Sequence, residues 1–247
     1  MDFPRSTITR RQVLFVKGLL VWLVLSTTVI FVLNAGQRVP RAVIGMGCGL
    51  IVLWVFLCGG LMVRFREAIA RGMRAVPLPE ALKLVLFATV LALLEEVVTV
   101  SMTNLAPLFG ARVGEAYITA SANYLDVVLH HSVIVFVPLF IGWALLLSKL
   151  EFSAFHVFLL FGITGTLAEA SFSGPQGFVG FGLWIPVYGL MVWLPALAMP
   201  APRRPWRLRW WMFPLAVFVP FLLEGPWAFL MGLCMTPHPK IHFPMLP

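Results

Sequence analysis

Charged residues are scarce in this chain of 247 residues. Asp, Glu, Lys and Arg make up 11% of it, whereas 60% of the residues are hydrophobic. Soluble domains carry about 25% charged residues, so this composition argues against a soluble domain. The mean hydropathy is +0.95. The long apolar runs that account for it predict a membrane protein.

Specific metal-binding and redox motifs are also lacking. The chain has three cysteines, Cys48, Cys58 and Cys234, with no CxxC spacing, and no HExxH sequence. Cys48 and Cys58 are ten residues apart in one apolar run, so they cannot easily pair if that run is helical. We interpret all three as small apolar packing residues.

Seven apolar runs approach the length of about 20 residues that a membrane-spanning helix requires. We therefore predict an all-α fold, a polytopic membrane helical bundle forming a single integral-membrane domain over residues 1–247. The predicted spans are 13–33, 43–63, 82–104, 124–147, 152–171, 180–199 and 212–233.

Basic residues predict the orientation of this bundle. With a cytoplasmic N-terminus, 14 of the 18 Lys and Arg residues fall on the cytoplasmic side, namely Arg5, Arg10, Arg11, Lys17, Arg64, Arg66, Arg71, Arg74, Lys83, Lys149, Arg203, Arg204, Arg207 and Arg209. By the positive-inside rule, we expect a C-terminus outside and a location in the cell (plasma or inner) membrane. The net charge of +8 then reflects membrane topology, with lipids and not nucleic acid as the partner.

Two basic segments are predicted to lie at the membrane surface. Segment 64–76 alternates Arg with apolar residues and is typical of a short interfacial helix on anionic lipid. Segment 203–211, RRPWRLRWW, combines Arg with Trp and is typical of an interfacial anchor for the last span.

Acids and histidines interrupt the predicted spans at similar depths. At 1.5 Å per residue, Glu95 and Glu96 lie roughly 20 Å from the cytoplasmic edge and Glu224 roughly 18 Å. His130 lies roughly 10 Å below the outer edge. One such residue at the membrane centre costs about 2.5–3.5 kcal/mol, so these groups need one another, a metal or a water-filled cavity.

Helical spacing suggests which of these residues meet. Glu96 shares a small, polar stripe with Thr99 and Thr103, which should face the bundle interior. Asp126 and His130 are four residues apart, so the carboxylate can orient the imidazole. We predict catalytic roles for Glu95, Glu96, His130 and Glu224, and ligands of a divalent metal such as zinc among Glu96, His130, His131, Glu169 and Asp126.

Three further segments carry weaker indications. Glu169 follows Gly162 and Gly165, small residues that allow close helix approach. Glu224 precedes Gly225 and Pro226, which predicts a helix break beside the acid, as in many ion or substrate sites. The tail HPKIH, 238–242, is rich in neighbouring prolines, so we do not expect a helix or a metal site there.

Two short patches resemble motifs of the CAAX-processing and related intramembrane proteases. Glu95 and Glu96 resemble the start of EExxxR, and Phe152 with His156 resembles FxxxH. The chain departs from the pattern because Val100 stands where Arg is expected and no third His motif follows. His156 also lies roughly 14 Å shallower than Glu95 in the predicted spans. We therefore do not assign the chain to this family.

Three functions remain open. A metal-dependent intramembrane hydrolase would use the Glu and His residues to bind and activate water. A proton-coupled transporter of a small solute would use them as a relay, although no internal repeat is visible. A structural or assembly subunit would use them only for hydrogen bonds between helices. The outer-half position suggests a lipid, peptide or small-solute substrate.

Overall fold

The computed structural model describes residues 9–202, 206–234 and 238–243. Within these ranges the regular elements are helices, accompanied by isolated bridges, which confirms the all-α prediction. Six helices are long and apolar enough to cross a membrane, or seven if one bent pair counts as a single span. Arg5, Arg203 and Arg204, used to predict the orientation, lie outside the described residues.

Helix α1 (Arg10–Leu33) lies at the edge of the bundle. It begins with a capping box in which Thr9 and Gln12 satisfy each other's backbone N–H groups. Its packing partners are mainly α2 and α8, and its apolar side chains largely face outward, with Leu33 73% exposed. This apolar outer surface is what a lipid-facing helix presents.

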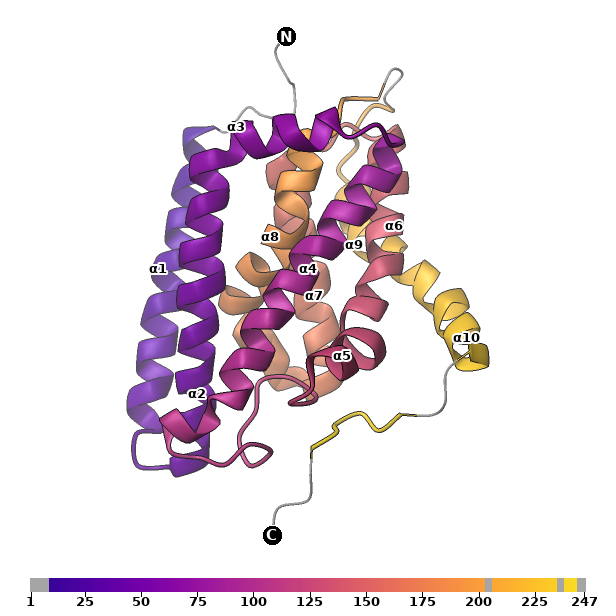
Figure 1. Cartoon of the computed structure of the whole chain (residues 1–247). Coiled ribbons are helices and arrows are strands. Elements are labelled where there is room, and N and C mark those ends of the chain that lie inside the picture. Colours follow the sequence, from indigo (N-terminus) through magenta and orange to yellow (C-terminus); the bar gives the residue numbers. More distant parts are fainter. Residues whose placement is uncertain (1–8, 203–205, 235–237, 244–247) are drawn as a thin grey trace.

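The next span is one continuous helical stretch of 38 residues. It consists of α2 (Arg38–Leu50), the π-helix η1 (Ile51–Cys58) and α3 (Gly59–Ala75). The labelled part of α3 runs across one end of the bundle, where segment 64–76 was predicted to lie on the membrane surface (Figure 1). The buried Trp54 donates from Nε1 to the Val187 carbonyl at 3.0 Å, which fixes this stretch against the bundle core.

Helix α4 (Glu80–Asn104) crosses the bundle and carries the paired acids. Glu96, Thr99 and Thr103 are buried, which confirms that this stripe faces the interior. The chain then passes through the 3₁₀ helix η2 (Ala106–Phe109) and an irregular loop that ends at Asn123. The side chain of Asn123 caps the next helix by accepting from the N–H groups of Leu125 and Asp126.

The fourth predicted span is broken. It consists of α5 (Tyr124–Asp126), the π-helix η3 (Val127–His131) and α6 (Val133–Lys149), and the chain bends by 47° at Ser132. The N–H of Ser132 donates to the carbonyl of Val127 at 3.0 Å, which closes the wide final turn. This bend directs α5 and η3 away from the line of α6 and places their polar residues near one end of the bundle.

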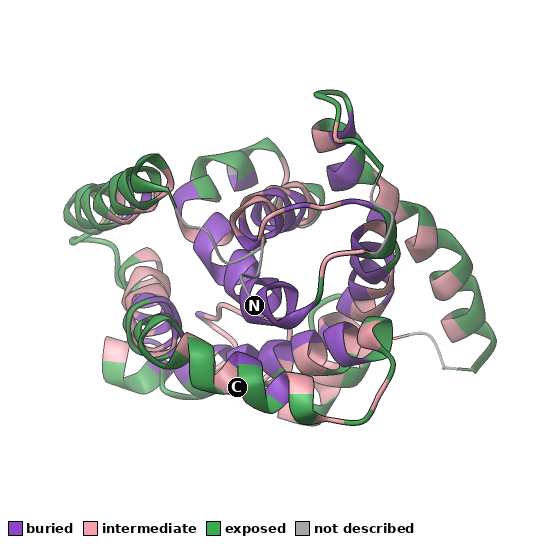
Figure 2. Ribbon diagram, turned by 90° about the horizontal axis from the view of Figure 1, so that it is seen from above, coloured by how far each residue is buried: buried purple, intermediate pink, exposed green. Residues whose placement is uncertain are grey.

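Helices α7 (Ala154–Ser173) and α8 (Phe181–Ala198) form the packed centre, joined through the 3₁₀ helix η4 (Pro175–Gly180). A Cβ at Gly162 would lie 2.6 Å from the Ile185 carbonyl oxygen, so the two backbones are nearly in contact. Most of α8 is buried, and Figure 2 shows the buried residues gathered on the central helices with exposed residues on the outer ones. The close approach agrees with the small-residue seam predicted on the fifth span.

The last predicted span is divided into α9 (Met212–Phe218), the 3₁₀ helix η5 (Val219–Leu223) and α10 (Glu224–Cys234). The 3₁₀ segment that interrupts the α-helix precedes Glu224 and contains Pro220. Pro226 lies inside the first turn of α10. Helix α10 projects from the side of the bundle and packs mainly on η5 and α6 (Figure 1).

The two ends of the bundle differ in charge. One end of the bundle contains most of the described Lys and Arg residues (Figure 1). At this end lie the start of α1, the α3–α4 connection, the end of α6 and the chain before α9. The loop after α4 and segment 238–243 lie at the opposite end. This uneven distribution is the pattern on which the predicted orientation depends.

Candidate metal centre and the buried acids beside it

Three carboxylates meet in the interior of the bundle. Glu95 and Glu96 of α4 are only 5% and 6% exposed, and their charges act on each other and on Glu169 of α7. Tyr188 of α8 lies within electrostatic reach of all three. We refer to Glu95, Glu96, Glu169 and Tyr188 as the acid cluster.

Hydroxyl groups from three helical segments hold these carboxylates in place. Thr99, one turn along α4, donates to Glu96 Oε2 at 2.8 Å, and Ser132 at the bend donates to Glu96 Oε1. The Tyr188 hydroxyl donates to Glu169 Oε1. The acid cluster therefore ties α4, the α5–α6 bend, α7 and α8 together.

Within the described residues, no Lys, Arg or His forms an ion pair with Glu95 or Glu96. Buried carboxyl groups gathered in this way, with hydroxyl donors around them, are suited to hold and pass protons. They are also suited to hydrogen-bond helices together, as a structural role requires.

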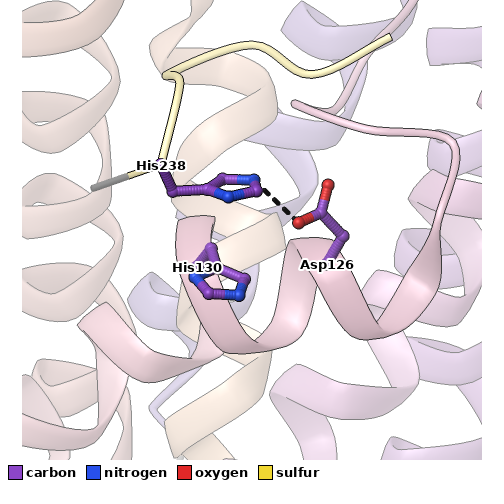
Figure 3. A group of neighbouring side chains, drawn as sticks. All are labelled: Asp126, His130 and His238. Atoms are coloured by element: carbon purple, nitrogen blue, oxygen red, sulfur yellow. Dashed lines mark ion pairs between the residues drawn. The ribbon is translucent and has the colours of Figure 1, made fainter. Parts of the chain in front are cut away.

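A second group of polar side chains surrounds Asp126 on α5. One ligand atom each from Asp126, His130 and His238 lies within 4.8 Å of the others (Figure 3). His238 Nε2 is 2.8 Å from Asp126 Oδ1, an ion-pair distance without hydrogen-bond geometry. The rings of His130 and His238 are stacked, with centroids 4.2 Å apart and 16° between their planes. We refer to Asp126, His130 and His238 as the triad.

Two further histidines border the triad. His242 Nδ1 lies 2.9 Å from Asp126 Oδ2, so both carboxylate oxygens of Asp126 face an imidazole. The His131 ring lies 5.0 Å from that of His238, and its buried Nε2 has no hydrogen-bond partner within the described structure. Four imidazoles are thus gathered near the carboxylate of Asp126.

This donor set suits a transition metal. Zn²⁺ binds imidazole nitrogen and carboxylate oxygen at about 2.0–2.2 Å, and catalytic zinc sites commonly have three protein ligands and one open position. The triad provides two imidazoles and a carboxylate, and a small inward shift would bring their ligand atoms around one ion. His242 would then be the outer partner that orients the carboxylate, as is usual around bound zinc.

The structure divides the predicted site residues between these two groups. Asp126 and His130 belong to the triad, and His131 lies beside it. Glu95, Glu96 and Glu169 belong to the acid cluster and are not part of the triad.

Glu224 lies on α10, outside the central helices, and is placed with neither group by the described contacts. Its Oε1 atom is buried without a hydrogen-bond partner in the described part of the chain.

Four residues that sequence analysis did not select belong to these groups. Ser132 and Tyr188 supply hydroxyls to the acids, and His238 and His242 come from the tail that was not expected to bind metal. The tail was judged as a site of its own, and its two histidines were not considered as partners for Asp126. The HxxxH spacing beyond the last span was the available signal.

The patch that resembles FxxxH does not join either group. His156 packs against aromatic rings, 5.1 Å from the Phe213 centroid and 6.3 Å from Phe152, and its Nδ1 is buried without a partner among the described residues. Comparisons with protein-family models, with curated proteins and with solved structures find no match for this chain.

Proposed function

We propose that the protein is a metal-dependent hydrolase of the cell membrane, with a zinc-like ion held by Asp126, His130 and His238. The observation that carries this proposal is the convergence of these three ligand atoms within 4.8 Å of one another. A bound ion of this class would activate a water molecule at its open position.

The residues of the chain have distinct roles in this proposal. The bend at Ser132 fixes the direction of α5 and η3, so that Asp126 and His130 would bind the same ion. His131, whose ring lies 5.0 Å from that of His238 and whose buried Nε2 has no partner among the described residues, would accept the proton from a water bound to such an ion. Glu96 lies on the other side of Ser132, where the acid cluster could take up protons.

The proposed orientation sets the class of substrate. With the basic end of the bundle in the cytoplasm, the triad lies toward the outer face of the membrane. Substrates would then arrive from the membrane or from outside, and we propose an ester- or amide-containing lipid or peptide.

A second function, a proton-coupled carrier, is favoured by a different observation. Glu95 and Glu96 are buried beside the half-buried Glu169 inside spanning helices, which a surface-facing hydrolase does not require. In a carrier, the triad would receive a divalent cation at the outer face and the acid cluster would exchange protons.

Metal analysis tests the shared part of these proposals. We expect the purified full-length protein to contain close to one zinc per chain, and Asp126→Asn and His130→Ala to lose it. The control is His156→Ala, which removes a histidine far from the triad in sequence and should leave the metal content unchanged. A wild-type protein that binds no zinc at micromolar concentration would refute the metal centre and favour the structural role.

Two activity measurements then separate hydrolase from carrier. A hydrolase should cleave a p-nitrophenyl ester in a zinc-dependent manner, and Asp126→Asn should abolish this cleavage. A carrier should instead take zinc into proteoliposomes when a pH gradient is applied, and Glu96→Gln should uncouple uptake from the gradient. Zinc uptake without ester cleavage would overturn the hydrolase proposal.

A further inference from the structure

Segment 238–243 is held against the loop that precedes α5. The N–H of His242 donates to the carbonyl of Ala120 at 2.7 Å, and His242 forms an isolated bridge with Ser121. Phe243 stacks on Tyr117, with ring centroids 4.7 Å apart and 29° between the planes. These contacts are independent of any metal and give the segment a defined docking position.

Glycine at position 114 allows this docking. Its φ is +87°, a left-handed conformation that favours glycine. A Cβ there would lie 3.1 Å from Cβ of Phe243, so a larger residue would also crowd the docked ring.

The docked segment completes the triad. Without it, α5 and η3 supply only Asp126 and His130, whereas zinc sites use three or four protein ligands. His238 adds the third ligand atom (Figure 3). Nδ1 of His242 faces the second carboxylate oxygen of Asp126. Both histidines come from a stretch more than a hundred residues away along the chain.

We propose that segment 238–243 is a clasp whose docking is coupled to metal binding, with His238 as a ligand and His242 as a positioning residue. This inference rests on the metal centre of the proposed function. Because the ligands include residues of the docked segment, metal binding stabilises docking and docking strengthens metal binding by the same factor. His242 acts through Asp126, whose carboxylate it orients toward the ion.

The exposed Lys240, inside the clasp, allows docking to be measured without an activity assay. Trypsin cleavage after Lys240 releases residues 241–247, and the rate of release is followed by mass spectrometry on the full chain in detergent. We expect zinc at 100 times its dissociation constant to slow this release by up to about 100-fold, and EDTA to reverse the effect.

Two variants separate a clasp from a fixed ligand. In His238→Ala, zinc should no longer slow cleavage after Lys240. In Phe243→Ala, which removes a docking contact but no ligand, cleavage should be faster at every zinc concentration. By linkage, Phe243→Ala should also bind zinc several-fold more weakly.

The positioning role of His242 has its own readout. We expect His242→Ala to weaken zinc binding by about 10–100-fold, the usual effect of removing an outer partner of a metal ligand. His242→Asn places a side-chain N–H at the position of Nδ1, the atom that faces Asp126, and should recover part of the affinity. Equal affinity in wild type, His242→Ala and His242→Asn would refute the positioning role.

Failure of the clasp differs from failure of the metal centre. If wild type binds one zinc but zinc does not change the cleavage rate, the clasp is refuted and the centre stands with other ligands. If wild type binds no zinc, the centre itself is refuted, whatever the cleavage rate.

Discussion

Replacing Gly162 with alanine should separate the two central helices. The added Cβ would lie 2.6 Å from the carbonyl oxygen of Ile185, which is 0.8 Å less than the 3.4 Å at which ordinary contact begins. It would also lie 2.7 Å from Cα of Ile185, so the obstruction is backbone that cannot rotate away. Helix α7 must therefore move away from α8.

The magnitude follows from two opposing effects. Overpacking of a close interface costs about 1–3 kcal/mol, and a rigid backbone neighbour puts Gly162→Ala in the upper part of that range. Alanine is favoured over glycine inside a helix by up to about 1 kcal/mol, which offsets part of the cost. We expect a net loss of about 1–2 kcal/mol in the free energy of unfolding.

Equilibrium unfolding in mixed micelles provides the measurement, with Gly18→Ala as the matched control. Gly18 lies in α1, and a Cβ there would meet no atom within 4 Å. This variant should be neutral or stabilised by up to about 1 kcal/mol. If Gly162→Ala is as stable as Gly18→Ala, the contact between α7 and α8 is not as close as described.

Two other predictions concern polar contacts. Ser132→Ala removes the hydroxyl that donates to Glu96 and should lower unfolding free energy by about 1–3 kcal/mol, whereas Ser148→Ala, at an exposed site on α6, should change it little. The second concerns Glu115, whose pKa is lowered because the N–H of Arg112 and the Arg38 guanidinium both donate to the carboxylate. The stabilising contribution of this depressed pKa is present above the ordinary carboxyl pKa of about 4.3 and is lost as the pH falls through the lower folded value. The measurement is hydrogen exchange of the backbone amides in the surrounding loop, corrected for intrinsic exchange rates. Protection should drop over that pH range in wild type and show no such drop in Glu115→Gln. An unchanged wild-type profile would contradict the assignment.

Much of the fold was predictable because local composition is enough to identify membrane-spanning helices. Runs of about 20 apolar residues place helices regardless of how they pack, and the predicted spans overlap the observed helices. The seam around Gly162 was also visible, because small residues at helical spacing indicate close approach.

The bends were harder to predict because they depend on hydrogen-bond register. The π-helical turn that ends at Ser132 contains no proline or glycine, and nothing in VVLHHS marks a change of direction. The break before Glu224 was placed at Pro226, but Pro226 lies in the first turn of α10, where a missing N–H has no cost.

The candidate site was predictable only in part, because depth along a span does not specify which helices face one another. The acids and histidines lie at a similar predicted depth in the membrane, which suggested one pocket. In the structure, the direction in which each helix presents its side chains and the bend at Ser132 divide them between the acid cluster and the triad. The return of His238 to Asp126 is a contact between distant parts of the sequence, and no local pattern encodes it.

The bend at Ser132 means that the triad and the acid cluster are mechanically joined through neighbouring residues. His130 stacks on the docked tail, and two residues later the serine hydroxyl holds Glu96 in the protein interior. A movement of residues 130–132 that opened the triad would also pull the Ser132 hydroxyl away from Glu96. Changes at the triad would thus reach the acid cluster through two residues, without displacement of an entire helix.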